Sequence, residues 1–399
     1  MAYSTTERPN RFCMSKNEIR YCFTVTELAR PGLYFQIKLM AGANELVLPP
    51  LKPNADGKVI VYLQQYIDSY LTYNIPFLEN FTNANNQWIN FFVATREVTN
   101  AIPNPEFIQP EASHVRTALK MGIEKNRYGR NNFFNYYGSK LMFLTWQPMG
   151  RTIAIDEPLF LTAFFPNFDT TNFFLKVNYQ CTDGTYGALS IALTGGNGFI
   201  YHCKTDVATL GLTAAVGSKK LYWYEVSVEV VGNDTGIMVN GFRFYIDYTK
   251  RYRHHDFIYI NSLGGVDTAR AVGEVTTSIE RDFEIVEGGF TANEWNTTIK
   301  GHDSFYTGIT QRRNYKGDMG FRATKEEQYA MIELLLSQYI YQIIDSRLVP
   351  ILALQKSQAM GKNTDKIQSF AIEWTLAETN ETFTPQHIAL GLGSDTETY

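Results

Sequence analysis

Apolar and polar residues alternate along much of this chain in short runs, which is the period of a β-strand with one buried face. The alternation is clearest in residues 33–40, where Leu33, Phe35, Ile37 and Leu39 are apolar at every second position. The predicted strands cover residues 19–28, 33–40, 88–98, 141–145, 152–155, 159–165, 173–179, 189–193, 222–231, 237–248, 257–260, 274–286, 297–300, 305–310, 348–354 and 367–377. Turn residues separate most of these runs, so the pattern predicts an all-β dominated fold of two to three tandem β-sandwich-like domains.

Helical spacing is confined to two short stretches. Apolar residues three and four apart predict one amphipathic helix near residues 63–71. Thr324 and Glu327 have the spacing of a capping box, and Tyr329, Ile332 and Leu336 follow it at helical spacing. We therefore expect a few short helices, one of them from Lys325 to about Leu336.

Proline and glycine clusters divide the chain into three predicted domains. Pro103, Pro105 and Pro110 form a predicted linker, which ends an N-terminal sandwich-like domain with one short helix at residues 1–110. A central β-sandwich at residues 111–250 opens with a loop rich in Gly, Asn and Tyr. The remainder, residues 251–399, is predicted to be β-rich, with the capped helix near 325–336 and a polar tail.

Composition favours protein contacts over nucleic-acid binding. Charged residues make up 19% of the chain and aromatic residues 14%, with 25 Tyr and 27 Phe. Charge is below the roughly 25% of an average soluble protein, and aromatic rings bury large area with few rotatable bonds. The formal net charge of −4 makes a nucleic-acid partner unlikely.

The cysteines and the N-terminus bear on where the chain folds. Cys13, Cys22, Cys181 and Cys203 show no Cys-x-x-Cys spacing, so we expect free thiols and a reducing compartment. The first ten residues are polar, and no run of about 18 apolar residues occurs. These patterns predict neither a signal peptide nor a membrane span.

Three patterns could carry chemistry, and none has the spacing that chemistry needs. His254, His255 and Asp256 are adjacent, but neighbouring side chains on a strand point to opposite faces and cannot easily share a metal ion. Residues 195–198 are Gly-rich but lack the Lys-Ser/Thr pair of a phosphate loop, so a hairpin turn is predicted. Glu225 and Glu229 share one strand face, as charged outer faces often do. We predict no catalytic, cofactor-binding or metal-ligating residues, no cofactor, no small-molecule substrate and no enzymatic activity.

The loop at residues 122–138 is the predicted interface. It combines aromatic rings with Lys125, Arg127 and Arg130, a mixture found both in single-stranded nucleic-acid sites and in protein interfaces. The negative net charge favours a protein partner. The candidate interface residues are Tyr128, Arg130, Phe133, Phe134, Tyr136 and Tyr137.

A tight turn is predicted where the aromatic strand 257–260 ends. Glycine adopts positive φ at low cost, so we expect at least one of Gly264 and Gly265 to do so, and we expect the side chain of Asn261 or Asp267 to bond nearby backbone. Asn261, Gly264, Gly265 and Asp267 are therefore predicted to be structural.

Three segments resemble structural virion proteins of tailed bacteriophages that infect Bacteroides and its relatives, the crAss-like phages among them. The segments are residues 53–61, 256–267 and 331–338, the last continuing through 348–351 to 373–380. The resemblance implies a component of the tail or neck, such as a ring, hub or adaptor subunit, assembled in copies around the symmetry axis. It implies copies of itself and other virion proteins as partners. It also implies localisation in the virion, after folding and assembly in the cytoplasm of the host bacterium.

Two alternatives remain open. A receptor- or glycan-binding β-sandwich adhesin would also be aromatic and β-rich, and should display aromatic residues in a shallow groove. A glycan-cleaving enzyme is less favoured, because it would need clustered acids or a metal.

Overall fold

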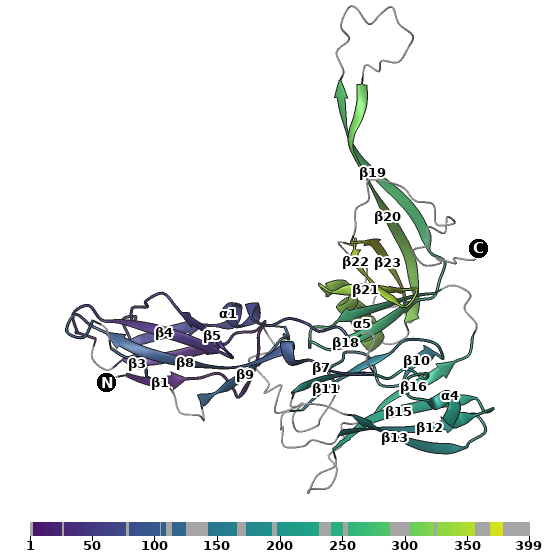
Figure 1. Ribbon diagram of the computed structural model, residues 1–399, viewed down its shortest axis with the longest axis horizontal. Coiled ribbons are helices and arrows are strands. Elements are labelled where there is room, and N and C mark those ends of the chain that lie inside the picture. Colours follow the sequence, from purple (N-terminus) through teal and green to yellow (C-terminus); the bar gives the residue numbers. More distant parts are fainter. Residues whose placement is uncertain are drawn as a thin grey trace, which may run out of the picture. The chain divides into compact units, whose positions relative to one another are not determined.

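The computed structural model describes residues 3–25, 28–76, 80–103, 105–108, 114–124, 143–165, 173–193, 198–230, 241–249, 254–287, 304–322, 325–355 and 368–377 (Figure 1). Strands dominate these residues, and the helices among them are short, as the sequence predicts. The chain divides into two compact units. The first comprises Met1–Tyr248 with Ile260–Asp267, and the second comprises Thr249–Tyr259 with Thr268–Tyr399.

The first unit begins with a sandwich of two sheets. One sheet has the order β1-β3-β6 and the other β2-β9-β8-β4-β5. The strands are β1 (Tyr3–Glu7), β2 (Phe12–Met14), β3 (Arg20–Val25), β4 (Tyr34–Ala41), β5 (Asn44–Val47), β6 (Lys58–Tyr62), β8 (Trp88–Val98) and β9 (Arg116–Leu119). Burial alternates along β4 as its sequence predicts, and Ile37 packs in one core with Phe23 and Val59 of the other sheet. The helix α1 (Gln64–Ser69) adds Ile67 to this core.

A second sandwich follows in the same unit. Its sheets have the orders β11-β14-β7 and β10-β16-β15-β12-β13. The strands are β7 (Phe81–Asn83), β10 (Arg151–Ala154), β11 (Phe160–Phe164), β12 (Phe173–Cys181), β13 (Tyr186–Leu193), β14 (Ile200–Lys204), β15 (Leu221–Val230) and β16 (Phe242–Asp247). Leu161 and Tyr201 of the smaller sheet share a core with Val177, Tyr224 and Phe244 of the larger one. The 3₁₀ turn η1 (Asn85–Gln87) and the helix α4 (Leu212–Val216) complete the unit.

A further apolar cluster draws on both sandwiches. It contains Phe12 and Met14 of β2 together with Phe164 of β11 and Ile200 of β14. Leu263, from the turn after the aromatic strand, is fully buried in the same cluster. This turn therefore belongs to the core of the first unit.

The second unit is built on a seven-stranded sheet of order β18-β17-β21-β22-β23-β20-β19. The strands are β17 (His255–Ile260), β18 (Val266–Ala271), β19 (Thr276–Glu287), β20 (Ser304–Arg322), β21 (Ile340–Ile344), β22 (Arg347–Ala353) and β23 (Gln368–Leu376). The helix α5 (Lys325–Leu336) packs Met331 and Leu334 into a core that contains Trp374 and Phe257.

The bounds of α5 are those predicted, but its predicted apolar face is wrong. Tyr329 and Leu336 are 56% and 71% exposed, whereas Ala330, Met331 and Leu334 are buried. The Tyr259 hydroxyl donates a hydrogen bond to the Ala330 carbonyl (3.0 Å), which helps to set the rotation of the helix.

The structure crosses the predicted boundaries in two places. β9 pairs with β2 and β8, so residues beyond 110 belong to the N-terminal sheet. Residues 260–267 belong to the first unit rather than to a domain that starts at 251. The predicted hairpin turn at residues 195–198 lies mostly outside the described residues, and the strands that flank it, β13 and β14, lie in different sheets.

Two further expectations concern the cysteines, predicted to be free thiols, and membrane-spanning segments, of which none is predicted. Cys13, Cys22, Cys181 and Cys203 are buried and free, as predicted. Within the described ranges, no helix is both long and apolar enough to cross a membrane.

Candidate functional site

The turn at residues 261–267, which we call the Gly-Gly corner, has the geometry expected from its sequence. Gly264 has a φ of +75°. The amide of Gly264 donates to the Asn261 carbonyl (3.0 Å), and the amide of Gly265 donates to the Asn261 side-chain oxygen (2.9 Å). Asn261 thus closes the turn with both its backbone and its side chain.

Each glycine of the corner is required for a different reason. A Cβ atom on Gly264 would lie 2.5 Å from the Lys120 carbonyl oxygen and would also be strained by the positive φ. A Cβ atom on Gly265 would overlap the Leu144 carbonyl oxygen. The backbone of the corner therefore lies against two other segments of the first unit.

Buried polar side chains hold these segments together. The Asn261 amide nitrogen donates to the Leu144 carbonyl (2.9 Å) and to one oxygen of Asp267 (2.7 Å), and the Thr145 hydroxyl donates to the other oxygen (2.6 Å). Asp267 is 1% exposed. Its carboxylate is therefore held by donors on both oxygens, as a buried charged group requires.

His202 extends the same network. Its side chain is fully buried, and its Nδ1 lies 2.8 Å from the Thr162 hydroxyl, which also accepts the Val266 amide (2.9 Å). In one orientation of its side-chain amide, Gln87 is matched to its polar neighbours. Its oxygen then accepts a hydrogen bond from His202 Nε2 (3.0 Å), and its nitrogen donates one to the Gly264 carbonyl (3.1 Å). Burial lowers the pKa of His202 to about 3, so the imidazole is neutral.

The corner and His202 thus form a structural junction. The partners named above are side chains and backbone groups of the first unit, and these groups hold the imidazole and the Asp267 carboxylate in place. Sequence reasoning identified Asn261 and Asp267 but missed Gln87, Thr162 and His202. A single His or Gln gives no local pattern, because its partners are far away along the chain.

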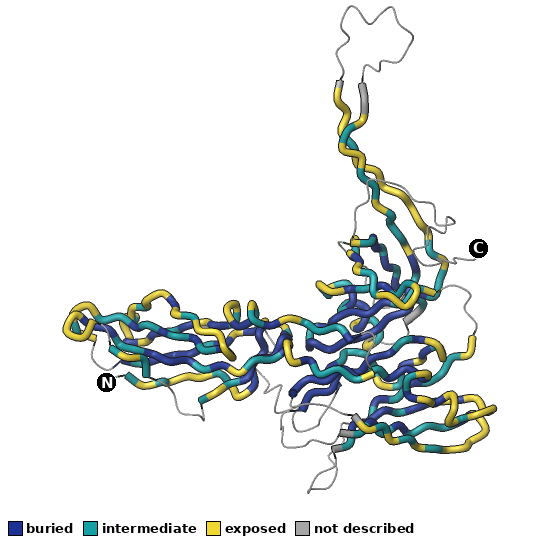
Figure 2. The backbone as a smooth tube through the Cα atoms, viewed as in Figure 1, coloured by how far each residue is buried: buried dark blue, intermediate teal, exposed yellow. Residues whose placement is uncertain are grey.

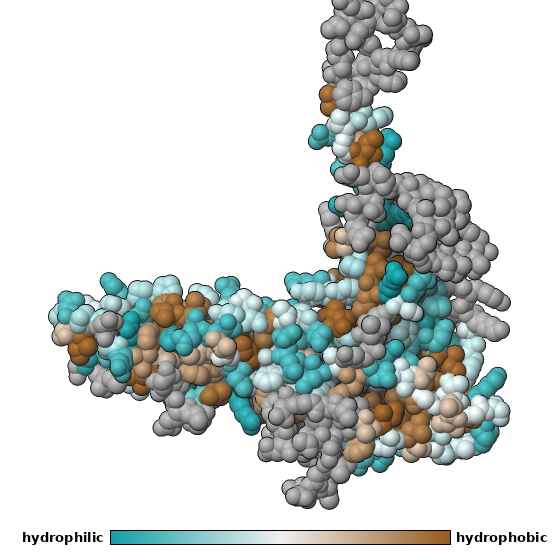
Figure 3. Space-filling view, viewed as in Figure 1, coloured by the Kyte–Doolittle hydropathy of each residue, from teal (hydrophilic) through white to brown (hydrophobic). Residues whose placement is uncertain are grey.

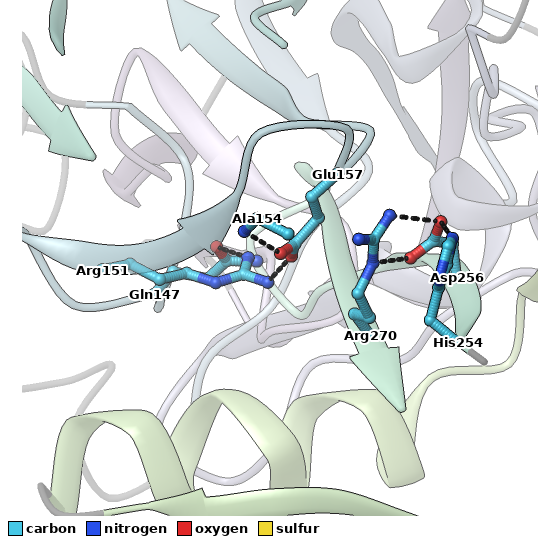
Figure 4. A network of polar contacts seen from close by, with 7 residues as sticks. All are labelled: Gln147, Arg151, Ala154, Glu157, His254, Asp256 and Arg270. Atoms are coloured by element: carbon cyan, nitrogen blue, oxygen red, sulfur yellow. Dashed lines mark hydrogen bonds and ion pairs between the residues drawn. The ribbon is translucent and has the colours of Figure 1, made fainter. Parts of the chain in front are cut away.

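Two buried ion pairs are also structural (Figure 4). In the first unit, Arg151 pairs with Glu157, and Gln147 accepts a second hydrogen bond from Arg151 (2.6 Å). In the second unit, the Arg270 guanidinium donates to both oxygens of Asp256 (2.6 and 2.9 Å). A fork of this kind fixes a carboxylate in orientation.

The adjacent residues His254, His255 and Asp256 contact different partners. The Asp256 carboxylate accepts hydrogen bonds from Arg270, and His254 Nε2 lies 3.7 Å from one oxygen of the same carboxylate. His255 instead bonds Gln342 (2.7 Å) and packs against Trp374. In the part of the chain that the structure describes, no three His, Cys, Asp or Glu side chains gather as metal ligands.

The outer face of the larger sheet of the second sandwich carries aromatic residues. Tyr186 is 69% exposed and meets Trp223 edge-to-face at 6.3 Å. The Arg243 guanidinium lies 4.1 Å from the centre of the Trp223 ring and binds Glu225 (2.8 Å). Glu225, one of the paired acids noted in the sequence, is therefore engaged in an ion pair.

The far part of β19 and β20 is a largely exposed piece of regular structure. Residues 279–287 of β19 and 304–313 of β20 form a two-stranded ribbon, which we call the arm, because β23 pairs with β20 only from Asn314 onward. Figure 1 shows these strands continuing past the ends of β22 and β23, and Figure 2 shows that they are mostly exposed. A two-stranded ribbon is only marginally stable alone in water.

The two faces of the arm differ in chemistry. Ile285 lies opposite Tyr306, and Tyr306 meets Phe283 edge-to-face at 4.7 Å, with the Arg281 guanidinium 4.6 Å from the Phe283 ring centre. Ile279, Ile285 and Tyr306 are 57%, 59% and 52% exposed. Hydrophobic surface on the arm is visible in Figure 3.

The opposite face of the arm is acidic. Glu280, Asp282 and Glu284 alternate with the apolar residues and are exposed. The residues Tyr128, Arg130, Phe133, Phe134, Tyr136 and Tyr137, predicted as an interface, lie outside the described residues, as does the polar tail.

Comparison with known proteins adds no family to this geometry. No family model matches the chain, and no curated protein matches it.

Proposed function

We propose that this chain is a structural component of a tailed-phage virion, a ring, hub or adaptor subunit of the tail or neck, that works through contacts between subunits. The observation that supports the proposal is the arm. Its apolar face is exposed along residues 279–285 and at Tyr306, although such surface is normally buried in a core or an interface. Catalysis has no part in this proposal.

The fold suits such a role. The Gly-Gly corner, its Leu263 side chain and the His202 network fix the core of the first unit. The seven-stranded sheet of the second unit anchors the base of the arm through β23. A rigid base with a projecting ribbon is suited to bury the ribbon against a neighbouring subunit. The Tyr128–Tyr137 segment remains a second predicted contact.

The proposal is tested by purifying particles of the phage that carries this gene and digesting them for mass spectrometry. We expect peptides from both units of the chain, in an amount that corresponds to several copies per particle. Particles that contain the major virion proteins but no peptide of this chain would reject the proposal.

A glycan-binding role is the second candidate, because of the exposed aromatic residues near Trp223. Tyr186 could stack on a sugar ring, but Arg243 already covers one face of Trp223. A glycan array with the wild-type chain and a Tyr186→Ala variant tests this role. Binding that is lost in the variant would favour an adhesin.

A further inference from the structure

Among the described residues, the outer edge of β19 pairs with no strand. β19 is the last strand of its sheet, and β20 is its partner strand in that part of the chain. Natural edge strands are usually protected by short length, by charged side chains or Pro, or by a bulge that twists the edge away. β19 has 12 residues and no Pro, and its charged residues are four acids and Arg281. The pairing of β19 with β20 contains one bulge, near Gly308. Its extra residue lies in β20, so the outer edge of β19 stays regular.

The side chains of β19 restrict which strand can pair with this edge. Ile279, Phe283 and Ile285 lie on one face together with Arg281, whose guanidinium lies over the Phe283 ring. The acidic row of Glu280, Asp282 and Glu284 lies on the other face. The partner must therefore be mainly apolar on one face and compatible with a row of carboxylates on the other.

A second copy of β19 is a poor partner. In an antiparallel pair of β19 strands related by a two-fold axis, the same face of both copies lies on the same side of the sheet, so one acidic row would lie against the other. Like charges directly opposite each other are destabilising. The acidic row thus protects the edge against self-pairing while leaving it open to a strand of opposite charge.

The inner edge of β19 shows the kind of strand it accepts. There β20 places Arg312 opposite Glu280 and Tyr306 opposite Ile285. On one face of the ribbon a cationic side chain, Arg312, therefore lies opposite an acidic one, Glu280. On the other face an aromatic side chain, Tyr306, lies opposite an aliphatic one, Ile285. The outer edge presents the same residues of β19 to a strand on its other side.

We propose that the outer edge of β19 binds an extended segment of another polypeptide as an added strand, and that this segment carries Lys or Arg at alternate positions with apolar residues between them. The proposal rests on the assembly role proposed above, since it names the surface and the chemistry of one subunit contact. Main-chain hydrogen bonds give such a contact its strength, and alternate side chains give it selectivity. The added strand would turn the arm into a three-stranded sheet and place its own apolar side chains beside those of β19.

The test uses the full chain and a synthetic peptide of the length of β19 in which Lys alternates with Val and Tyr. Binding is measured by fluorescence anisotropy. Three control peptides replace Lys by Glu, group the Lys residues at one end, or carry N-methyl groups on every amide. We expect the alternating Lys peptide to bind and all three control peptides to bind at least roughly tenfold more weakly.

The matching protein variant is Glu280→Lys/Asp282→Lys/Glu284→Lys. Its control is Glu18→Lys/Asp56→Lys/Glu106→Lys, which reverses three exposed acids of the first unit and gives the same net charge. The β19 variant should bind the Lys peptide roughly tenfold more weakly, because three attractive cross-strand pairs become repulsive. The control variant should bind like wild type, and both variants should keep the wild-type circular dichroism spectrum.

Several results would overturn the inference. These are no binding of the alternating peptide to wild type, equal binding to both variants, and equal binding of the grouped-Lys or N-methylated peptide. A wild-type dimer in sedimentation that disappears in the β19 variant would assign the edge to a second copy instead. Peptide binding by a chain that is absent from particles would reject the virion role but keep the edge site, so the two proposals fail separately.

Discussion

At the scale of single residues, Gly264 and Gly265 are limited by different atoms. Gly264 has a positive φ and approaches Lys120, whereas Gly265 has no left-handed strain and is limited by the Leu144 carbonyl and the Asn261 side-chain nitrogen. Gly184 serves as a control for backbone strain without a steric clash. Its φ is +83°, and a Cβ atom placed on it would have nothing within 4 Å.

These constraints predict a ranking of Gly→Ala variants by free energy of unfolding. Gly184→Ala should cost about 1–2 kcal/mol from strain alone. Gly265→Ala should cost about 1–3 kcal/mol from overpacking, and Gly264→Ala should cost about 2–4 kcal/mol because both effects apply. Denaturant unfolding followed by fluorescence measures the series. Equal losses in Gly264→Ala and Gly184→Ala would show that the Lys120 contact is unimportant.

His202 predicts a pH dependence of stability. Its folded-state pKa, lowered by burial to about 3, lies below the unfolded value of 6.5, so the stabilisation is complete above pH 6.5 and is lost as pH falls toward 3. At pH 5 the loss from this residue is about 2 kcal/mol relative to pH 7.5.

A His202→Gln variant removes the titrating group and serves as the reference. Its unfolding free energy should be lower than that of wild type at pH 7.5, but should fall by about 2 kcal/mol less on going to pH 5. The same drop in both proteins would mean that His202 is not the group responsible.

The local geometry of the Gly-Gly corner could be predicted from sequence, and its surroundings could not. Asn261 and Gly264 form contacts within a few residues, which a turn pattern encodes. The contact from Asn261 to Leu144 spans 117 residues, and that from Gln87 to His202 spans 115. Such contacts depend on how the sheets pack, and no spacing in the sequence records them.

At the scale of elements, α5 shows how a correct helix can be assigned the wrong face. Tyr329, Ile332 and Leu336 have helical spacing, but so do Ala330, Met331 and Leu334, and the second set is buried. The choice between them depends on the sheet under the helix, which the pattern of the helix alone does not describe.

This assignment predicts opposite outcomes for two Leu→Ala variants in α5. Leu334→Ala should reduce the free energy of unfolding by about 2–5 kcal/mol, because it leaves a cavity beside the sheet. Leu336→Ala should change it by no more than about 0.5 kcal/mol, since this side chain is 71% exposed. Thermal and denaturant unfolding of both variants provide the measurement, and a larger loss at Leu336 would refute the assignment.

The bounds of a strand could be predicted well where buried and exposed residues alternate, as in β4. They could not be predicted where only hydrogen bonding to a neighbouring strand determines how far the strand extends, as in β20. β20 was expected only at residues 305–310, yet it runs from Ser304 to Arg322. The polar residues from Gln311 to Asn314 have weak strand preference, and their partners on β19 extend the strand.

The arm predicts that a shortened chain remains folded. Replacing residues 279–313 by Asn-Gly would join Ser278 to Asn314, which are opposite each other in the ribbon, through a turn suited to a two-residue hairpin. Because Ile279, Ile285 and Tyr306 are exposed, the melting temperature should stay close to that of wild type.

The same deletion should abolish incorporation into particles, measured by the amount of the variant that sediments with them. The control is a Leu336→Ala chain, which changes one exposed apolar residue outside the arm. Normal incorporation of the armless chain would show that the arm is not the contact.

At the scale of the whole molecule, we propose that the chain works by burying the arm against another polypeptide in a virion. The direct test places a photo-crosslinking amino acid at Tyr306, which is exposed on the apolar face of the arm, and irradiates purified particles. We expect a covalent adduct between this position and a second virion polypeptide, identified by mass spectrometry. Particles that contain the chain but give no adduct from Tyr306, or that lack the chain altogether, would contradict it.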